Sequence, residues 1–109
     1  MKFNTVIIAY QELNARNFGG VLRQPIIVSL RHRGHHAAVV SSTNKATYLT
    51  VNPKDFDSVL HMRSVIYHEM THQYVEEFLG IDEEEEHGPI FWRNYRMFAT
   101  PELELGESL

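Results

Sequence analysis

Apolar residues recur at helical spacing in three segments of the chain. The first covers residues 5–16, and the longest covers residues 59–79, which have apolar side chains on two faces and are followed by Gly80. The third covers residues 89–99 and begins with Pro89, a residue type favoured at the first position of a helix. We therefore predict three helices, the middle one buried on both sides.

Shorter apolar segments between the first two helices predict strands. Residues 24–30 form an apolar run suited to a strand that is buried on both faces. Residues 37–41 and 46–51 are strand-like segments on either side of a polar turn at 42–45, and together they predict a β-hairpin.

The middle helix contains the sequence His-Glu-Met-Thr-His at positions 68–72. On a helix, residues four apart lie on one face about 5 to 6 Å apart, so His68 and His72 can reach one metal ion. Zinc is the expected metal, because it binds neutral imidazole nitrogens, and a hydrolytic zinc site keeps three protein ligands and leaves a fourth position to water. The apolar residues around the two histidines predict a buried helix, in which unpaired histidines would be unfavourable.

A third ligand is expected shortly after this helix. His87 occurs in the sequence His-Gly-Pro-Ile-Phe, where Gly88 and Pro89 predict a helix start that would hold His87 at the rim of the site. The acidic run 81–86 before it is typical of a solvated loop. We favour His87 as the third ligand, and a carboxylate from the run Glu83 to Glu86 is the alternative.

The two motifs, residues 68–72 and 87–91, together resemble the SprT-like zinc metallopeptidase domain, and the resemblance runs from about residue 5 to residue 98. It implies an α+β, zincin-like fold with an N-terminal helix, a three-stranded sheet with a hairpin, the metal-binding helix and a C-terminal helix that carries the third ligand at its start. It also implies that one hairpin strand, residues 36–41, is the sheet edge to which an extended peptide would add as another strand.

The motif chemistry and the resemblance imply a zinc metalloendopeptidase that acts on protein or peptide substrates. Zinc held by the three histidines would lower the pKa of a water molecule toward about 7, and Glu69 would take its proton as general base. Three side chains are candidate donors to the oxyanion: Tyr48, Tyr95 and Arg96. Spartan-like members of the family act on proteins attached to DNA, so the resemblance suggests DNA-associated substrates.

Chain length and composition indicate the number of domains, the possible metal ligands and the cellular compartment. The chain has 109 residues, 43% of them hydrophobic, which fits one small domain over residues 1–99 and an acidic tail over residues 100–109. It has no cysteine, so a metal site must use histidines and carboxylates. No apolar run approaches the ~20 residues of a membrane span, and no signal peptide is evident, so we expect a cytoplasmic protein.

The formal net charge of −4 argues against strong, general binding of nucleic acid. Residues 31–36 include two arginines and three histidines, but such a run is more often a solvated turn. His35 and His36 are adjacent, so in a strand they would face opposite ways. His61 shares the ligand face of the middle helix but precedes His68 by a distance of about 10 Å along the axis. None of these histidines enters the predicted metal site.

A function without catalysis also fits the sequence. The chain could be a catalytically silent, zinc-stabilised module that binds protein or nucleic acid. Glu69 weighs against this alternative, because a purely structural zinc site needs no base and normally closes its fourth position with a protein ligand.

Overall fold

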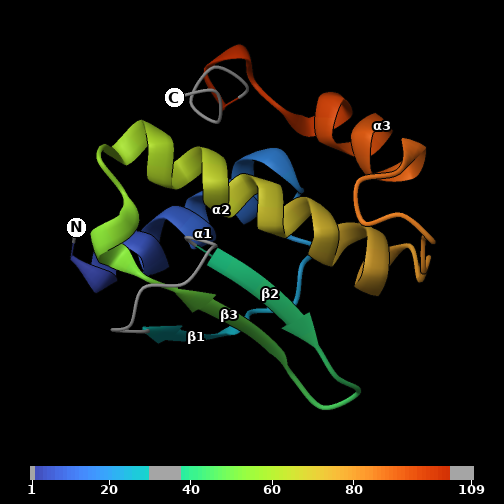
Figure 1. Cartoon of the computed structure of the whole chain (residues 1–109), viewed down its shortest axis with the longest axis horizontal. Helices are drawn as coiled ribbons and strands as arrows, with labels where there is room; N and C mark the ends of the chain where they lie inside the picture. Colours follow the sequence, from blue (N-terminus) through green and yellow to red (C-terminus); the bar gives the residue numbers. More distant parts are fainter. Residues whose placement is uncertain (1, 30–37, 104–109) are drawn as a thin grey trace.

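The protein has an α+β fold in the computed structural model, which describes residues 2–29 and 38–103. The predicted helices and strands occur in the predicted order (Figure 1). Along the chain the elements are α1 (Phe3–Asn17), β1 (Ile26–Ser29), β2 (Ala38–Ser42), β3 (Thr47–Val51), the 3₁₀ turn η1 (Pro53–Asp55), α2 (Val59–Gln73), the π-helical turn η2 (Tyr74–Phe78) and α3 (Pro89–Phe98).

Helix α2 is the centre of the fold. It packs against α1 and the strand β2, and α3 lies on its other side, away from the sheet (Figure 1). The prediction that this helix is buried on both sides is confirmed, because α2 contributes to the core toward both α1 and α3. The fully buried apolar side chains of the core include Val6, Tyr10, Leu13, Leu49, Val51, Met62, Ile66, Tyr67, Met70 and Phe91.

The sheet has the strand order β1-β3-β2, with β3 in the middle. Strands β2 and β3 form the predicted hairpin and pair antiparallel, with Val40 opposite Leu49. Strand β1 pairs parallel to β3, with Ile26 opposite Tyr48. The prediction that a hairpin strand is a sheet edge is confirmed, because β2 pairs with β3 alone in the described part of the chain.

The prediction of a strand buried on both faces at residues 24–30 is wrong. Strand β1 is shorter and lies at the other edge of the sheet, where Ile26 is 51% exposed and Val28 is 38% exposed. Ile27, on the opposite face, packs against the core. The helices cover only the core face of this strand, so an apolar run alone did not indicate burial on both faces.

The middle helix begins as expected but does not stay α-helical to its end. Ser58 caps α2, because its Oγ accepts a hydrogen bond from the His61 N–H at 3.0 Å. After Gln73 the chain widens into η2, where the Leu79 N–H donates to the Tyr74 carbonyl five residues back, at 3.0 Å. Gly80, with φ +67°, then ends the helix. The prediction of one regular helix over 59–79 is therefore corrected to an α-helix followed by a π-helical turn.

The C-terminal segment begins as predicted and then packs on the core. Helix α3 starts at Pro89, with Gly88 as its N-cap residue. Leu103 is buried in the core, so the described part of the segment 100–109 packs against the rest of the fold. Among the helices of the described residues, none has the length and apolar character that a membrane crossing requires.

Candidate metal centre

Two histidines project from the same face of α2, as their spacing predicts. The ring centroids of His68 and His72 are 5.1 Å apart. His72 is buried with 7% exposure, and His68 is half-buried. The buried residues of α2 pack the helix into the core, and both imidazoles lie on one side of it.

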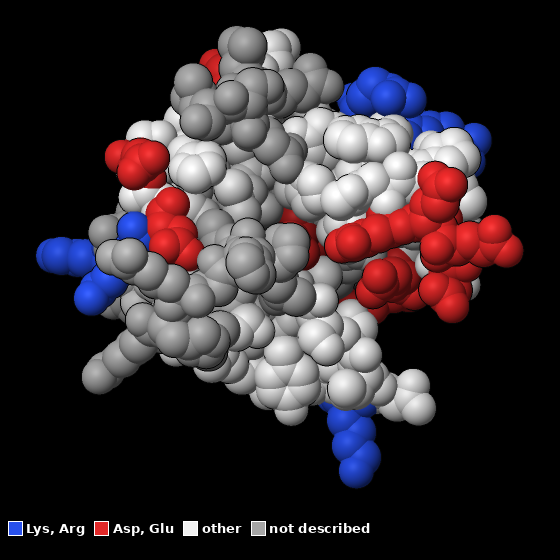
Figure 2. Space-filling model, viewed as in Figure 1, with Lys and Arg blue, Asp and Glu red and all other residues white. Residues whose placement is uncertain are grey.

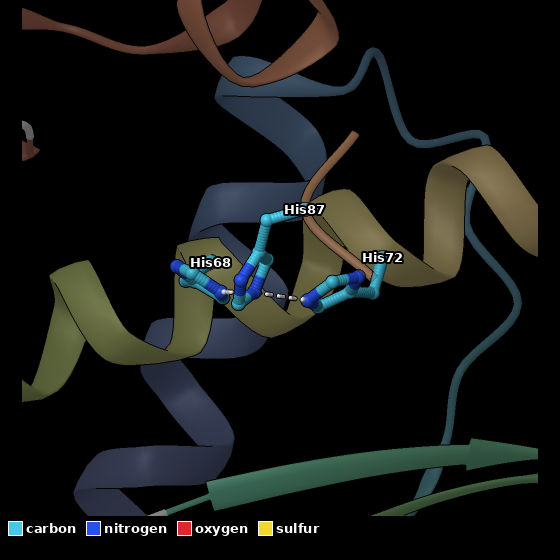
Figure 3. Close-up of side chains that lie close together, drawn as sticks. All are labelled: His68, His72 and His87. Carbon is cyan, nitrogen blue, oxygen red and sulfur yellow. Dashed lines mark hydrogen bonds between the residues drawn. The ribbon is translucent and has the colours of Figure 1, made fainter. Parts of the chain in front are cut away.

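The third histidine comes from the loop before α3. Nε2 of His87 lies 2.9 Å from Nε2 of His68 and 3.2 Å from Nε2 of His72 (Figure 3). The nitrogens of all three lie within 4.8 Å of one another. Nitrogens that bind one zinc ion tetrahedrally at 2.0 to 2.1 Å lie about 3.3 Å apart. The three histidines therefore lie close enough to bind one metal ion, and their spacing fits imidazole ligands around one.

A buried aromatic ring supports all three imidazoles. The Phe91 ring stacks on His72 with centroids 4.4 Å apart and an interplanar angle of 29°. It also lies 4.9 Å from the His68 ring and 5.0 Å from the His87 ring. Phe91 and Tyr95 are both buried in the core, and the Phe91 ring packs against all three imidazoles of the candidate site.

Glu69 points from α2 toward the sheet edge. Its Oε2 accepts a hydrogen bond from the backbone N–H of Val40, on β2, at 3.1 Å. The carboxylate is half-buried. It thus lies between α2 and the edge strand β2, one helical position from His68.

Of the three candidate donors to an oxyanion, one lies near the histidines. The Tyr95 ring is buried, with its centroid 6.1 Å from that of His68. Tyr48 is 39% exposed and alternates along β3 with the buried Leu49, so it faces away from the core. Arg96 is exposed on α3. The position of Tyr95 favours it among the three.

The acidic loop before His87 lies beside the site. Glu86 approaches the buried His72, with its Oε1 4.0 Å from Nε2 of that residue. Figure 2 shows acidic side chains gathered on one side of the face that it views. Glu76 is exposed, yet partial desolvation raises its pKa, and the nearby carboxylates of Asp82, Glu77 and Glu86 raise it further. Negative charge is therefore concentrated next to the histidines.

The cluster of possible ligands in the described residues contains His87 and no carboxylate of this loop. The side chain of Glu83 is turned toward α3, where it accepts hydrogen bonds from the N–H groups of Ile90 and Phe91. In the described residues, the ligand atoms close enough to hold an ion come from His68, His72 and His87.

A polar network at the end of α2 was not expected from the sequence. Glu77 accepts hydrogen bonds from the side chains of Thr47, Ser42, Gln73 and Arg23. Burial alone would raise the pKa of this carboxyl, but the four donors outweigh it and lower the pKa. Its partners are up to 54 residues away in the chain, so no local pattern indicated the network.

Of the other histidines, the structure describes only His61, and it is not part of the three-histidine cluster. His61 lies beside Phe56 near the start of α2, with ring centroids 5.8 Å apart, and its exclusion from the metal site is consistent with the described geometry. The basic run at residues 31–36 lies outside the described residues, so the prediction of a solvated turn there stays a prediction.

The chain matches no protein-family model, no curated protein and no solved structure in the comparisons. The resemblance to the SprT-like domain therefore depends on the two histidine motifs.

Proposed function

We propose that the protein is a zinc-dependent metalloendopeptidase of the zincin type, which hydrolyses peptide bonds in protein substrates. One observation supports this proposal above all. The imidazole nitrogens of His68, His72 and His87 converge, and Glu69, which follows His68 on α2, faces the edge strand β2. A three-histidine site with a neighbouring carboxylate is the arrangement that metal-assisted hydrolysis uses.

Zinc is the metal that the donor set favours. Three neutral imidazoles suit zinc among the divalent ions, and three protein ligands leave a fourth position open to water, as in hydrolytic sites. Zinc bound there would acidify a water molecule and polarise the carbonyl of the substrate.

The residues of this chain would then handle the proton and the substrate. Glu69 would take a proton from the attacking water and return it to the leaving amine. The Val40 N–H donates to this carboxylate, which orients it between the metal-binding helix and the substrate edge. Tyr95 is the candidate donor to the oxyanion.

The edge of β2, which pairs with no second strand in the described residues, supports an extended peptide as the substrate. A strand that pairs with this edge would run beside Glu69. A groove of about 470 Å³ lies at the end of β2, lined by Ser42, Thr43, Asn44, Arg23, Glu76, Glu77 and Phe78 among others. A peptide along β2 would continue into this groove.

A matched set of variants tests the proposal. The wild-type protein, purified without a His tag, should contain one zinc per chain and cleave an unfolded protein such as casein, and a chelator should abolish the cleavage. Glu69→Gln should keep the zinc and lose hydrolysis by about 10²-fold or more. His72→Ala should lose both. Hydrolysis that persists in Glu69→Gln would contradict the mechanism.

The alternative, a zinc-stabilised binding module without catalysis, has one observation in its favour. Glu69 binds the backbone of β2, so its carboxylate has a structural role that needs no chemistry. In that case the wild type would bind zinc but cleave no substrate, and Glu69→Gln would bind partners as the wild type does.

Association with DNA is a further proposal that follows from the family resemblance alone. The net charge of −4 and the acidic side chains beside His72 would repel a phosphate backbone there. We therefore expect protein to be the direct substrate, with any binding of DNA weak and steeply reduced by salt. A gel-shift titration at several salt concentrations would test this expectation.

A further inference from the structure

The carboxylate of Glu83 caps α3 from outside the helix. Its Oε2 accepts a hydrogen bond from the Ile90 N–H at 3.0 Å, and its Oε1 accepts one from the Phe91 N–H at 2.8 Å. The first N–H groups of a helix have no partner within the helix, and a carboxylate near them is also favoured by the helix dipole. Gly88, at the N-cap position, has no side chain that could do this.

Glycine at position 88 leaves room for this carboxylate. A Cβ atom added to Gly88 would meet an oxygen of Glu83 and would lie 2.9 Å from its Cδ, closer than real Cβ contacts. The φ of Gly88 is −80°, which any residue can adopt. Space, and not backbone conformation, therefore explains the glycine, and Glu83 and Gly88 form one packing unit.

The loop between Glu83 and the start of α3 contains the third histidine, His87. His87 is exposed and lies outside any helix, so the position of its imidazole depends on how the loop is closed. Glu83 closes the loop by binding the backbone of Phe91, whose ring lies 5.0 Å from His87 and 4.4 Å from His72. The same two bonds thus link the loop, α3 and the imidazoles of α2.

Glu83 differs in this respect from the glutamates that follow it. It is half-buried, whereas Glu84, Glu85 and Glu86 are exposed. The sequence shows four identical residues in a row, and the structure assigns a distinct contact to the first of them.

We propose that Glu83 is a positioning residue of the metal site, which holds His87 where it completes the three-histidine cluster. This inference rests on the proposed metal binding but not on peptide hydrolysis. Groups that orient metal ligands from outside the ligand shell typically contribute 10- to 100-fold in metal affinity.

The test compares two variants with the same change of charge. Glu83→Gln places an amide N–H₂ against the N–H groups of α3, whereas Glu84→Gln changes an exposed neighbour. The zinc affinity of each is measured by competition with a fluorescent chelator. We expect Glu83→Gln to weaken zinc binding by about 10- to 100-fold and Glu84→Gln to stay within about threefold of the wild type, since loss of one exposed charge is largely screened.

A double-mutant cycle with His87 separates positioning from general stability. In a His87→Ala background, Glu83→Gln should weaken zinc binding by less than about twofold, because the ligand that it positions is gone. A residue that only stabilises the fold would weaken binding equally in both backgrounds, or would lower the thermal stability of the zinc-free protein without changing zinc affinity. Either result would overturn the inference.

Gly88→Ala provides a second variant, which keeps the Glu83 carboxylate but displaces it. If Glu83→Gln does not fold, the zinc affinity of Gly88→Ala is compared in the wild-type and His87→Ala backgrounds instead. Affinities that are equal in Glu83→Gln, Gly88→Ala and Glu84→Gln would overturn the positioning role and leave the metal site standing. A wild type that binds no zinc would instead overturn the proposed function.

Discussion

The backbone N–H of Val40 donates a hydrogen bond to Oε2 of Glu69 at 3.1 Å. In an antiparallel pair, alternate residues turn their N–H and C=O groups away from the partner strand. Val40 is such a residue of β2, and its outward N–H meets the carboxylate proposed as the general base. Helix α2, which contains His68 and His72, and the edge strand β2 are thus joined at one contact.

This contact predicts different effects of two substitutions on stability. Glu69→Ala leaves the Val40 N–H without this acceptor, and we expect the free energy of unfolding to fall by about 1–3 kcal/mol. Glu69→Gln keeps an oxygen acceptor, so its loss should be smaller. Urea unfolding of the zinc-free proteins measures both. Equal midpoints for the two variants would mean that the bond to Val40 has no effect on stability.

Zinc content should depend on His87 and not on His61. We expect His87→Ala to bind zinc far more weakly, because two imidazoles remain of the three that converge. His61→Ala removes a histidine of the same helix that lies beside Phe56, and it should keep one zinc per chain. Elemental analysis of the untagged proteins gives the answer. Zinc retained without His87 would move the third ligand to a carboxylate of the acidic loop.

Glu77 should stabilise the fold at neutral pH and lose this effect in acid. Its pKa is lowered in the folded protein, since hydrogen bonds to the charged form outweigh its burial. A lowered folded pKa means that the stabilisation is present above the unfolded pKa, about 4.3, and is lost as the pH falls through the folded value. We expect Glu77→Gln to lower the free energy of unfolding at pH 7 by about 1–3 kcal/mol and to flatten its decline in acid.

Glu76, the residue before Glu77, provides a control because its pKa is shifted in the opposite direction. Partial desolvation and the neighbouring carboxylates raise its pKa, so the folded protein favours its protonated form. Its contribution to stability should therefore increase as the pH falls through the raised value. Glu76→Gln should leave stability at pH 7 unchanged or slightly higher. A loss of stability equal to that of Glu77→Gln would contradict the assignment of opposite shifts.

Tyr10 should be sensitive to the loss of its hydroxyl. This group donates to Oε1 of Gln73 at 2.6 Å, and both side chains are buried. Tyr10→Phe leaves a buried acceptor without this donor, which should reduce the free energy of unfolding by about 1–3 kcal/mol. The matched control is Tyr48→Phe at an exposed position, which we expect to change stability by less than about 0.5 kcal/mol. Thermal unfolding monitored by circular dichroism would compare them.

Much of the fold and the metal cluster could be predicted because the signals are local. The spacing of His68 and His72 determines that they share a helix face whatever packs around them. The polar turn between two strand-like segments likewise predicts the hairpin, and Gly88 and Pro89 predict the start of α3. The contacts of Glu77 and Glu83 could not be predicted, because nothing in a pair or run of glutamates indicates which carboxylate meets a donor on another segment.

The sequence by itself determined the order of helices and strands and the shared helix face of His68 and His72, since periodicity and short spacings act within a few residues of the chain. His87 was favoured as their third partner, and the tertiary structure brings it to them. Only the tertiary structure decided that β1 lies at an exposed edge, that Glu69 faces Val40, and that Glu83 caps the helix after His87. These relationships depend on which segments are neighbours in space. The packing of the whole core around α2 decides which segments become neighbours, and the sequence of no single segment determines it.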